Sequence, residues 1–471
     1  MSMTLKENKI LFAILLFDFI GILLTLVFNS TAMADEFEHL RASYLVSLGN
    51  VPYRDFFEHH HPLLWFTFAP IIGILPHKPV MILYIAKALA FICSALTFYI
   101  IFLMFRRFWR DYKVFGYFLA LVFLFYPLWY SVSIFKPDTF ARLFYFCGLY
   151  FFMCYIEKQQ LKSLIWCGIS FCIAFLFIQT IAFSILPLCI PALYLFYKNP
   201  RFYKDVAISA ILPCSIIMAA LALLYYSGSI VNYWQENILF NQNLFHYLCN
   251  KLTSVVFYWA LHIVAGFIAG FWLFKKQPSI YTNIIFLLFV SELIQHLYFP
   301  AVFPHYLVLL FIFMSMLIAL VIPQIKNQII IGYFYAFLAV SIALNFVTLG
   351  LKNNLEYMRG YKIVNQSPTY DTLHITFNFV NIYAPMQTFY TLFPHHFAWL
   401  DNYLFNRFPD YDVNSIIKNP AFVYLDYLPK DNIVPVELYH ERFILSEENL
   451  QNYEEISHGL YRRKNAVKSE Y

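Results

Sequence analysis

Long apolar runs, separated by short polar connections, fill the first 350 residues of the chain. An α-helix needs about 20 apolar residues to cross a bilayer, and most of these runs reach or approach that length. The pattern therefore predicts a polytopic α-helical membrane protein with about eleven transmembrane helices. These helices are expected at residues 10–29, 79–104, 114–131, 139–156, 163–180, 183–197, 205–226, 254–273, 279–298, 305–322 and 328–349.

A polar, aromatic-rich loop at residues 30–78 interrupts this pattern after the first predicted span. Within it, residues 35–48 predict a short amphipathic helix. Residues 62–75 predict a second, apolar helix that lies in the membrane interface. A second long connection covers residues 227–253. These two loops are therefore the largest polar segments between the predicted spans.

The tail at residues 350–471 changes in character and is richer in Asp, Glu, Asn and Pro. Two of its segments, 421–425 and 455–461, predict β-strands. Its length is sufficient for a small domain of its own. We therefore expect a transmembrane domain at residues 1–349, followed by a small α/β extracytoplasmic domain at residues 350–471.

Lysine and arginine are distributed unevenly between the two sets of connections, and this asymmetry predicts the orientation. The basic set holds Lys6, Lys9, Arg106, Arg107, Arg110, Lys113, Lys158, Lys162, Lys198, Arg201, Lys204, Lys275, Lys276 and Lys326. The opposite set holds only Arg41, Arg54, Lys78, Lys136 and Lys251. Because basic connections stay in the cytoplasm, the first loop and the tail are expected outside.

The composition supports the same class of protein. Hydrophobic residues make up 61% of the chain and charged residues 13%, against about 45–50% and about 25% in soluble domains. Soluble, disordered and disulfide-rich classes are thereby excluded. The net charge is only +5, so nucleic acid is not an expected partner. The apolar runs make membrane lipid an expected partner. The chain lacks Walker, GxSxG, HExxH and GxGxxG motifs, which argues against an ATP-driven pump, a serine hydrolase or a nucleotide-binding domain.

Two acidic residues, Asp35 and Glu36, stand where the first predicted helix leaves the membrane. An aspartate at the edge of a membrane cavity can accept a proton from an incoming hydroxyl group. The alternative is that the pair stabilises the N-terminus of the following helix. The residues alone leave both interpretations open.

A histidine-rich segment in the same loop offers candidate ligands for a metal. Glu58, His60 and His61 combine a carboxylate with imidazoles, a set that suits a divalent transition metal. The alternative is that these residues are polar interfacial groups or donate to a phosphate. Arg54 is a candidate for bidentate phosphate binding or for contact with a lipid headgroup. No cofactor is certain from the sequence, and metal dependence stays open.

Further candidates lie at the outer ends of two other predicted helices. Asp138 and Arg142 are four residues apart, and therefore on one helix face. They are either a functional pair or a self-neutralised helix start, and ionisable groups within a membrane favour function. His305 and Tyr306 open the predicted span at 305–322, where they are candidates for phosphate contact or ordinary interfacial residues.

These segments together resemble the GT-C superfamily of membrane glycosyltransferases, in particular protein O-mannosyltransferases and lipid A aminoarabinose transferases. The resemblance rests on the acidic pair, on Gly49-Asn-Val-Pro-Tyr-Arg-Asp-Phe56 and on His61-Pro-Leu63. Lys136-Pro-Asp138 and the Pro304-His-Tyr306 entry to the tenth span are also similar to that superfamily. In layout the resemblance covers roughly residues 10–350.

The resemblance implies an inverting glycosyltransferase that moves a sugar from a polyprenyl-phosphate donor to an acceptor hydroxyl at the outer face of the membrane. The acceptor would be a glycolipid such as lipopolysaccharide, a cell-wall glycan or a protein. It also implies a multi-pass protein of the bacterial inner membrane, with its active site and C-terminal domain facing the periplasm. Asp35 matches the acidic residue expected to act as base, and Asp138 matches the second acidic position.

The same resemblance suggests roles for the remaining candidates. Glu36 and Glu58 would contribute on the acceptor side or in secondary positions. Gln179 and His305 stand where relatives often carry Lys and Arg, which reduces the positive charge available for a phosphate. The candidates for binding the donor phosphate are Arg54, His60, His61, Arg142, His305 and Tyr306.

Two other functions are compatible with a polytopic membrane protein. A transporter or lipid flippase would use intramembrane charges such as Asp18 and Lys87 for coupling, without chemistry. Transporters commonly have repeated halves and helices interrupted by Gly or Pro, and this chain has no internal repeat. A non-catalytic assembly protein would not explain a charged, histidine-rich first loop. The sequence therefore favours the enzyme.

Overall fold

The structure is a computed structural model of the full chain. It describes residues 34–75, 78–111, 114–125, 128, 131–242, 259–298, 304–325, 372–375, 422–425, 452–457 and 460–464. The predicted spans at 10–29 and 328–349 lie outside these residues, as does Asp18. Lys87, the other intramembrane charge named from the sequence, is buried on a long helix.

The described helices follow the predicted spans closely. The principal ones are α2 (Ala34–Ser47), α3 (Leu63–Ile74), α4 (Pro79–Met104), α5 (Val114–Leu124), α7 (Pro137–Lys158), α8 (Leu161–Phe177), α9 (Ile181–Ile185), α10 (Cys189–Lys198), α11 (Phe202–Tyr226), α12 (Ile230–Tyr233), α14 (Ala260–Lys276), α15 (Ile280–Tyr298) and α16 (Val308–Val321). Short 3₁₀ or π segments join them: η1 (Phe105–Trp109), η2 (Ser131–Ser133), η3 (Leu186–Leu188), η4 (Trp234–Leu239), η6 (Pro304–Leu307) and η7 (Ile322–Gln324).

Five helical segments among the described residues are long and apolar enough to cross a membrane: Pro79–Trp109, Pro137–Lys158, Ile181–Lys198, Phe202–Tyr226 and Ile280–Tyr298. Each coincides with a predicted span. The predicted span at 163–180 is the 17-residue α8, and the one at 305–322 is η6 with α16. The described residues before position 326 therefore form mainly apolar helices, as the hydrophobic pattern predicts.

The chain divides into two compact units. The first comprises residues 1–29, 58–64 and 86–351, and the second comprises residues 30–57, 65–85 and 352–471. The change from one unit to the other at Leu351 and Lys352 lies next to the predicted domain boundary at 349/350.

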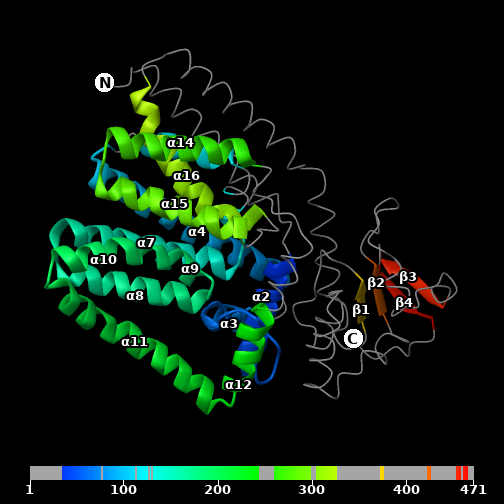
Figure 1. Cartoon of the computed structure of the whole chain (residues 1–471). Coiled ribbons are helices and arrows are strands. Elements are labelled where there is room, and N and C mark those ends of the chain that lie inside the picture. The colour runs from blue at the N-terminus through cyan, green and yellow to red at the C-terminus, as the bar shows by residue number, and fades with distance from the viewer. Residues whose placement is uncertain are drawn as a thin grey trace. The chain divides into compact units, whose positions relative to one another are not determined.

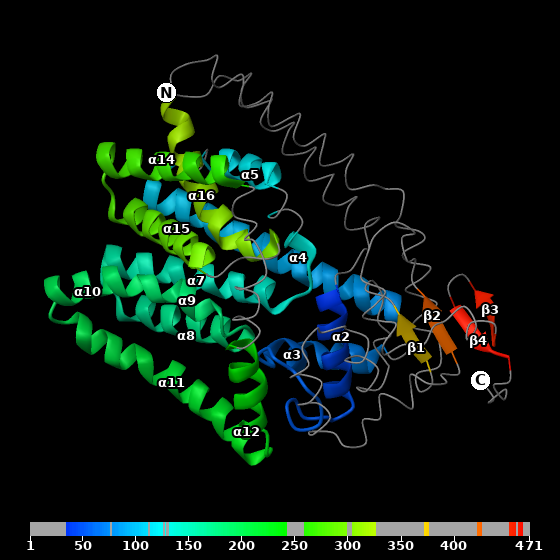
Figure 2. The same ribbon diagram turned by 45° about the vertical axis from the view of Figure 1, so that its right-hand side comes forward.

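Helices in the first unit pack in two groups, which both views show (Figures 1 and 2). In one group α8 packs against α7 and α11, and in the other α14, α15 and α16 pack against one another. Small residues allow the close approach. A Cβ atom on Gly148 would lie 2.6 Å from the Phe171 ring, and one on Gly168 would lie 3.1 Å from Pro213. Small residues serve the same purpose in membrane helix packing generally.

The start of α7 carries several helix-initiating features. Pro137 occupies the first turn, where its missing N–H costs nothing, and Asp138 places a carboxylate at the positive end of the helix dipole. At the other end Lys158 lies in the last turn and Gln159 adopts a left-handed conformation. These features fix where α7 begins, and so fix the depth of its polar residues.

In the second unit the two short helices predicted in the first loop are present as α2 and α3. The indole N–H of Trp65 on α3 donates a 3.2 Å hydrogen bond to Nδ1 of His39 on α2, and both side chains are fully buried. The Tyr53 and Phe56 rings, in the intervening turn, each lie 6.3 Å from the Trp65 ring. An aromatic core therefore unites α2, α3 and the turn between them.

The described part of the tail forms a four-stranded sheet with the order β1-β2-β4-β3. Its strands are β1 (Thr372–Ile375), β2 (Phe422–Leu425), β3 (Tyr453–Ser457) and β4 (Leu460–Arg463). The first pair is parallel and the others are antiparallel. The strand predicted at 421–425 is confirmed as β2. The single strand predicted at 455–461 is wrong, because the described residues of this segment belong to two antiparallel strands, β3 and β4.

Candidate active site

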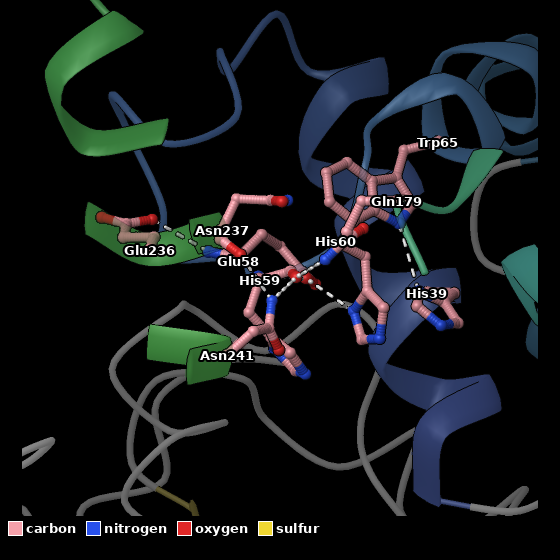
Figure 3. Close-up of polar contacts among 9 residues, drawn as sticks. All are labelled: His39, Glu58, His59, His60, Trp65, Gln179, Glu236, Asn237 and Asn241. Atoms are coloured by element: carbon pink, nitrogen blue, oxygen red, sulfur yellow. Dashed lines mark hydrogen bonds and ion pairs between the residues drawn. The ribbon is translucent and has the colours of Figure 1, made fainter. Parts of the chain in front are cut away.

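A short loop at residues 58–61 carries three of the polar side chains that the sequence singled out, Glu58, His60 and His61. The backbone N–H of Glu58 donates a 3.1 Å hydrogen bond to Oε2 of Glu236, a completely buried residue of η4. The carbonyl of His59 accepts from two side-chain amides, Asn241 Nδ2 at 2.7 Å and Gln179 Nε2 at 3.2 Å (Figure 3). Residues far along the chain therefore fix the backbone of this histidine loop.

Three side chains of the histidine loop are close enough to share a metal ion. One ligand atom from each of Glu58, His59 and His60 lies within 4.8 Å of the others. Tetrahedral zinc with bonds of about 2.0–2.2 Å separates its ligand atoms by roughly 3.4 Å, so an inward movement of about an ångström would close the set. The donor types fit zinc, and three protein ligands would leave one coordination position open.

The Glu58 carboxylate is also organised for such a role. It is buried, with 2% of its side chain exposed, and its Oε2 lies 3.5 Å from Nδ1 of His60. The same oxygen accepts a hydrogen bond from the His59 backbone N–H. Interactions that orient ligands in this way are typical of metal sites.

His61 plays a different role from the one the sequence suggested. Its Nδ1 contacts the carbonyl oxygen of Phe175, which can only accept, so this nitrogen carries the proton. Its Nε2 then accepts from the Tyr233 hydroxyl at 2.9 Å. Because both ring nitrogens of His61 have partners, this side chain connects the loop to α8 and α12. The cluster of possible metal ligands therefore contains His59, and not His61, beside Glu58 and His60.

Burial lowers the pKa of the His61 imidazole to about 4, from an ordinary value of 6.5. In the unfolded chain the ring binds a proton below pH 6.5, whereas the folded protein excludes it until about pH 4. Stability is therefore complete above pH 6.5 and falls as the pH decreases through this window. A difference of this size corresponds to a loss on the order of 3 kcal/mol.

We expect this loss to be measurable as a decrease in the melting temperature of the detergent-purified protein between pH 6.5 and pH 4. His61→Gln keeps a polar side chain without a titrating ring, so its melting temperature is expected to be lower at pH 7.5 and to change less over the same range. If the melting temperatures of the two proteins fell equally between pH 6.5 and pH 4, the acid sensitivity would belong to groups other than His61.

A second polar group lies at the beginning of α7. Arg142 is buried, and its Nη2 donates to Thr139 Oγ1 at 2.9 Å and to the Ser131 carbonyl at 3.3 Å. Asp138, one turn earlier, is partly exposed and acts electrostatically on the Arg142 guanidinium. Asp138 and Arg142 thus lie one turn apart on one helix, and the hydrogen bonds that orient the arginine come from two neutral partners.

Lys136, directly before α7, adds a second buried cation that the sequence did not select as a candidate. Only 4% of this residue is exposed. Its Nζ lies 5.6 Å from the ring centre of Tyr306, at a distance typical of a cation–π contact. Tyr306 and His305 belong to η6, which leads into α16. Tyr306 therefore meets a cation at the entry of α7.

In the second unit the acidic pair occupies the first turn of α2. Glu36 is completely buried, whereas Asp35 is partly exposed. Both carboxylates are favourably placed at the positive end of the helix, as the helix-stabilising interpretation requires. The two residues differ in exposure, because Asp35 is accessible to solvent and Glu36 is not.

The Arg54 side chain in the following turn pairs with its neighbour. Its Nε and Nη2 donate to the two carboxylate oxygens of Asp55, each at 2.8 Å. This hydrogen bond raises the pKa of the exposed Arg54 guanidinium. Asp55 also accepts the Val51 backbone N–H at 2.7 Å, which closes the turn. Phosphate binding by Arg54 would therefore compete with an existing carboxylate partner.

Several residues that shape the histidine loop come from the connection at 227–253, where sequence reasoning assigned no site. They are Tyr233, Glu236, Asn237 and Asn241. Gln179 lies in the turn between α8 and α9, and its side-chain amide donates a hydrogen bond to the histidine loop. The available signal was the run of hydrogen-bonding side chains at Asn232-Tyr-Trp-Gln-Glu-Asn237 between two apolar segments.

Comparisons with known proteins support the predicted resemblance. The family model described as dolichyl-phosphate-mannose-protein mannosyltransferase matches residues 61–226. No curated protein sequence matches the chain. The fold is similar to that of ArnT from Cupriavidus metallidurans bound to undecaprenyl phosphate, with a TM-score of 0.63 and 13% identity over 87% of this chain and 92% of that one. ArnT from the same organism in the apo state gives a TM-score of 0.55 and 11% identity over 93% and 90%. The predicted resemblance is thus confirmed, and the chain is an integral multi-pass membrane protein that shares the fold of ArnT.

Proposed function

We propose that the chain is a glycosyltransferase that moves a sugar from a polyprenyl-phosphate donor to an acceptor hydroxyl at the outer face of the membrane. The observation that carries this proposal is the fold shared with ArnT over most of both chains, since that protein was crystallised with undecaprenyl phosphate bound. The family match over residues 61–226 points to the same donor class. The proposed acceptor is a glycolipid, a cell-wall glycan or a protein.

The chemistry requires a base at the acceptor and cations at the departing phosphate. Asp35 would take the acceptor proton as the hydroxyl oxygen bonds to the anomeric carbon, and the bond from that carbon to the phosphate would break. Attack opposite the phosphate inverts the configuration. The leaving polyprenyl phosphate keeps the bonding electrons, so no nucleotide or ATP is needed. Positioned charges of this kind are a principal source of catalysis.

Among the donor-phosphate candidates, the residues at the α7 entry are supported best by their surroundings. Arg142 is buried and oriented by Thr139, and Asp138 stands beside it. Tyr306 contacts the buried Lys136. His305, His60 and Arg54 complete the proposed set, with Glu36 and Glu58 in secondary positions. His61 contributes by fixing the loop through Phe175 and Tyr233.

Glu58, His59 and His60 would hold a divalent metal in this proposal. When bound, the ion would supply a further positive charge for a phosphate oxygen. Eleven transmembrane helices, an extracytoplasmic α/β tail and a bacterial inner-membrane location with the active site facing the periplasm belong to the same proposal. The lysine and arginine asymmetry of the connections supports this orientation.

The proposal is tested by incubating the protein in lipid nanodiscs with polyprenyl-phosphate sugars and measuring the release of free polyprenyl phosphate. Nucleotide sugars serve as the matched control donors. We expect release from at least one lipid-linked donor and no turnover of any nucleotide sugar. Turnover of nucleotide sugars, or failure to bind any lipid donor, would contradict the proposal and, in the second case, favour a transporter.

A further inference from the structure

The side-chain amide of Asn237 is buried and unpaired among the described residues of the first unit. The residue lies in η4 and is only 1% exposed. Neither its Nδ2 nor its Oδ1 has a hydrogen-bond partner among the described residues. Buried polar groups in native proteins are nearly always hydrogen-bonded, and leaving an entire amide unpaired is costly. Such a group therefore points to a ligand that completes it.

Asn237 lies directly beside the histidine loop. The Asn241 Nδ2 atom donates to the Asn237 carbonyl and to the His59 carbonyl, at 2.7 Å each, so a single nitrogen joins the two backbones. The preceding residue, Glu236, accepts from the Glu58 backbone N–H. Figure 3 shows these residues together around Glu58 and His59. The unpaired amide is therefore part of the candidate site.

A second unpaired amide oxygen belongs to the same group. Gln179 donates through Nε2 to the His59 carbonyl, but its buried Oε1 has no hydrogen-bond partner among the described residues. Asn237 thus offers donors and an acceptor, and Gln179 offers a further acceptor. All of these atoms are neutral hydrogen-bond donors or acceptors, which suits the hydroxyl groups of an uncharged ligand.

We propose that Asn237 and Gln179 bind hydroxyl groups of the donor sugar. One sugar hydroxyl would accept from Asn237 Nδ2 while its neighbour donates to Oδ1, and a third would donate to Gln179 Oε1. A pair of adjacent hydroxyls matches the donor and acceptor of a carboxamide, whereas the carrier lipid has no group of this kind. The inference rests on the proposed function, because it assigns the site that distinguishes one lipid-linked sugar from another.

The test compares binding of bare undecaprenyl phosphate with binding of undecaprenyl phosphate carrying mannose, glucose or 4-amino-4-deoxyarabinose. The wild-type protein is expected to bind at least one sugar-bearing lipid more tightly than the bare carrier. In Asn237→Leu this preference should fall by about tenfold or more, while the affinity for the bare carrier stays unchanged. Replacing an unpaired amide by an apolar side chain of similar size should leave the melting temperature equal or higher.

Asn283→Leu is the matched control. Its Oδ1 also lacks a partner among the described residues, but it lies in the first turn of α15 and takes no part in the histidine loop. This variant should keep the sugar preference of the wild-type protein.

Several outcomes would overturn the inference. The first is a wild-type protein with no preference for any sugar, which is expected if the amide binds only a water. The second is an unchanged sugar preference in Asn237→Leu. The third is an equal loss of affinity for all of the lipids, together with a lower melting temperature. The proposed function would survive these results provided that carrier release is still observed. It fails together with the inference only if the wild-type protein binds neither the bare carrier nor any sugar-bearing form.

Discussion

Replacing Asp35 by asparagine is expected to lower the rate of sugar transfer by about 100- to 10,000-fold, the usual contribution of a positioned general base. Asparagine has almost the same shape but cannot accept the acceptor's proton. Asp35 is partly exposed in the first turn of α2, where a carboxylate at the helix end is worth about 0.3–1 kcal/mol. The measurement is the initial rate of carrier release at saturating donor and acceptor.

Glu36→Gln provides the comparison that separates catalysis from helix stabilisation. Both residues lie in the first turn of α2, but Glu36 is completely buried. If the pair only stabilises the helix, the two variants should lower the melting temperature by similar amounts and neither should lose transfer selectively. Full transfer activity in a well-folded Asp35→Asn protein would show that the proton acceptor is another group.

The sequence predicted the helical elements well because their cause is local. Apolar runs of bilayer length must form helices to satisfy their backbone groups, which is why α4, α7, α11 and α15 lie where the hydrophobic pattern places them. The placement of Asp138 and Arg142 on one helix face was predictable for the same reason, since helical periodicity puts positions four residues apart on the same face.

The histidine loop could not be predicted in the same way. Its shape depends on contacts with Gln179, Glu236 and Asn241, which are 120 or more residues away. Periodicity carries no information about such contacts. The roles of His59 and His61 are an example: the three adjacent histidines are equivalent in the sequence, and only the contacts with Phe175 and Tyr233 remove His61 from the set of ligand candidates.

The second large effect is expected at the Glu58–His59–His60 cluster. Purified protein should contain about one zinc ion per chain, and Glu58→Gln should remove most of it, because the amide is a poor ligand and cannot balance the charge of the ion. Carrier release should fall at least 10- to 100-fold, as is usual when a metal site is disturbed. Metal content is measured by inductively coupled plasma mass spectrometry.

Glu292→Gln is the matched control for this substitution. Glu292 and His296 form another buried carboxylate–imidazole pair, separated by 3.7 Å, on α15. The two side chains provide one ligand fewer than the cluster in the histidine loop. Metal content should therefore be the same in this variant as in the wild-type protein, and an equal loss in both variants would indicate a general effect of buried glutamate substitution.

The comparison of His59 with His61 decides which histidines hold the ion. The sequence suggested Glu58, His60 and His61, whereas the geometry groups Glu58 with His59 and His60. His59→Gln should therefore lose zinc while keeping most of its thermal stability. His61→Gln should keep zinc but melt at a lower temperature, because it loses the bonds to Phe175 and Tyr233. The reverse pattern would return His61 to the ligand set and require the loop to rearrange on binding the metal.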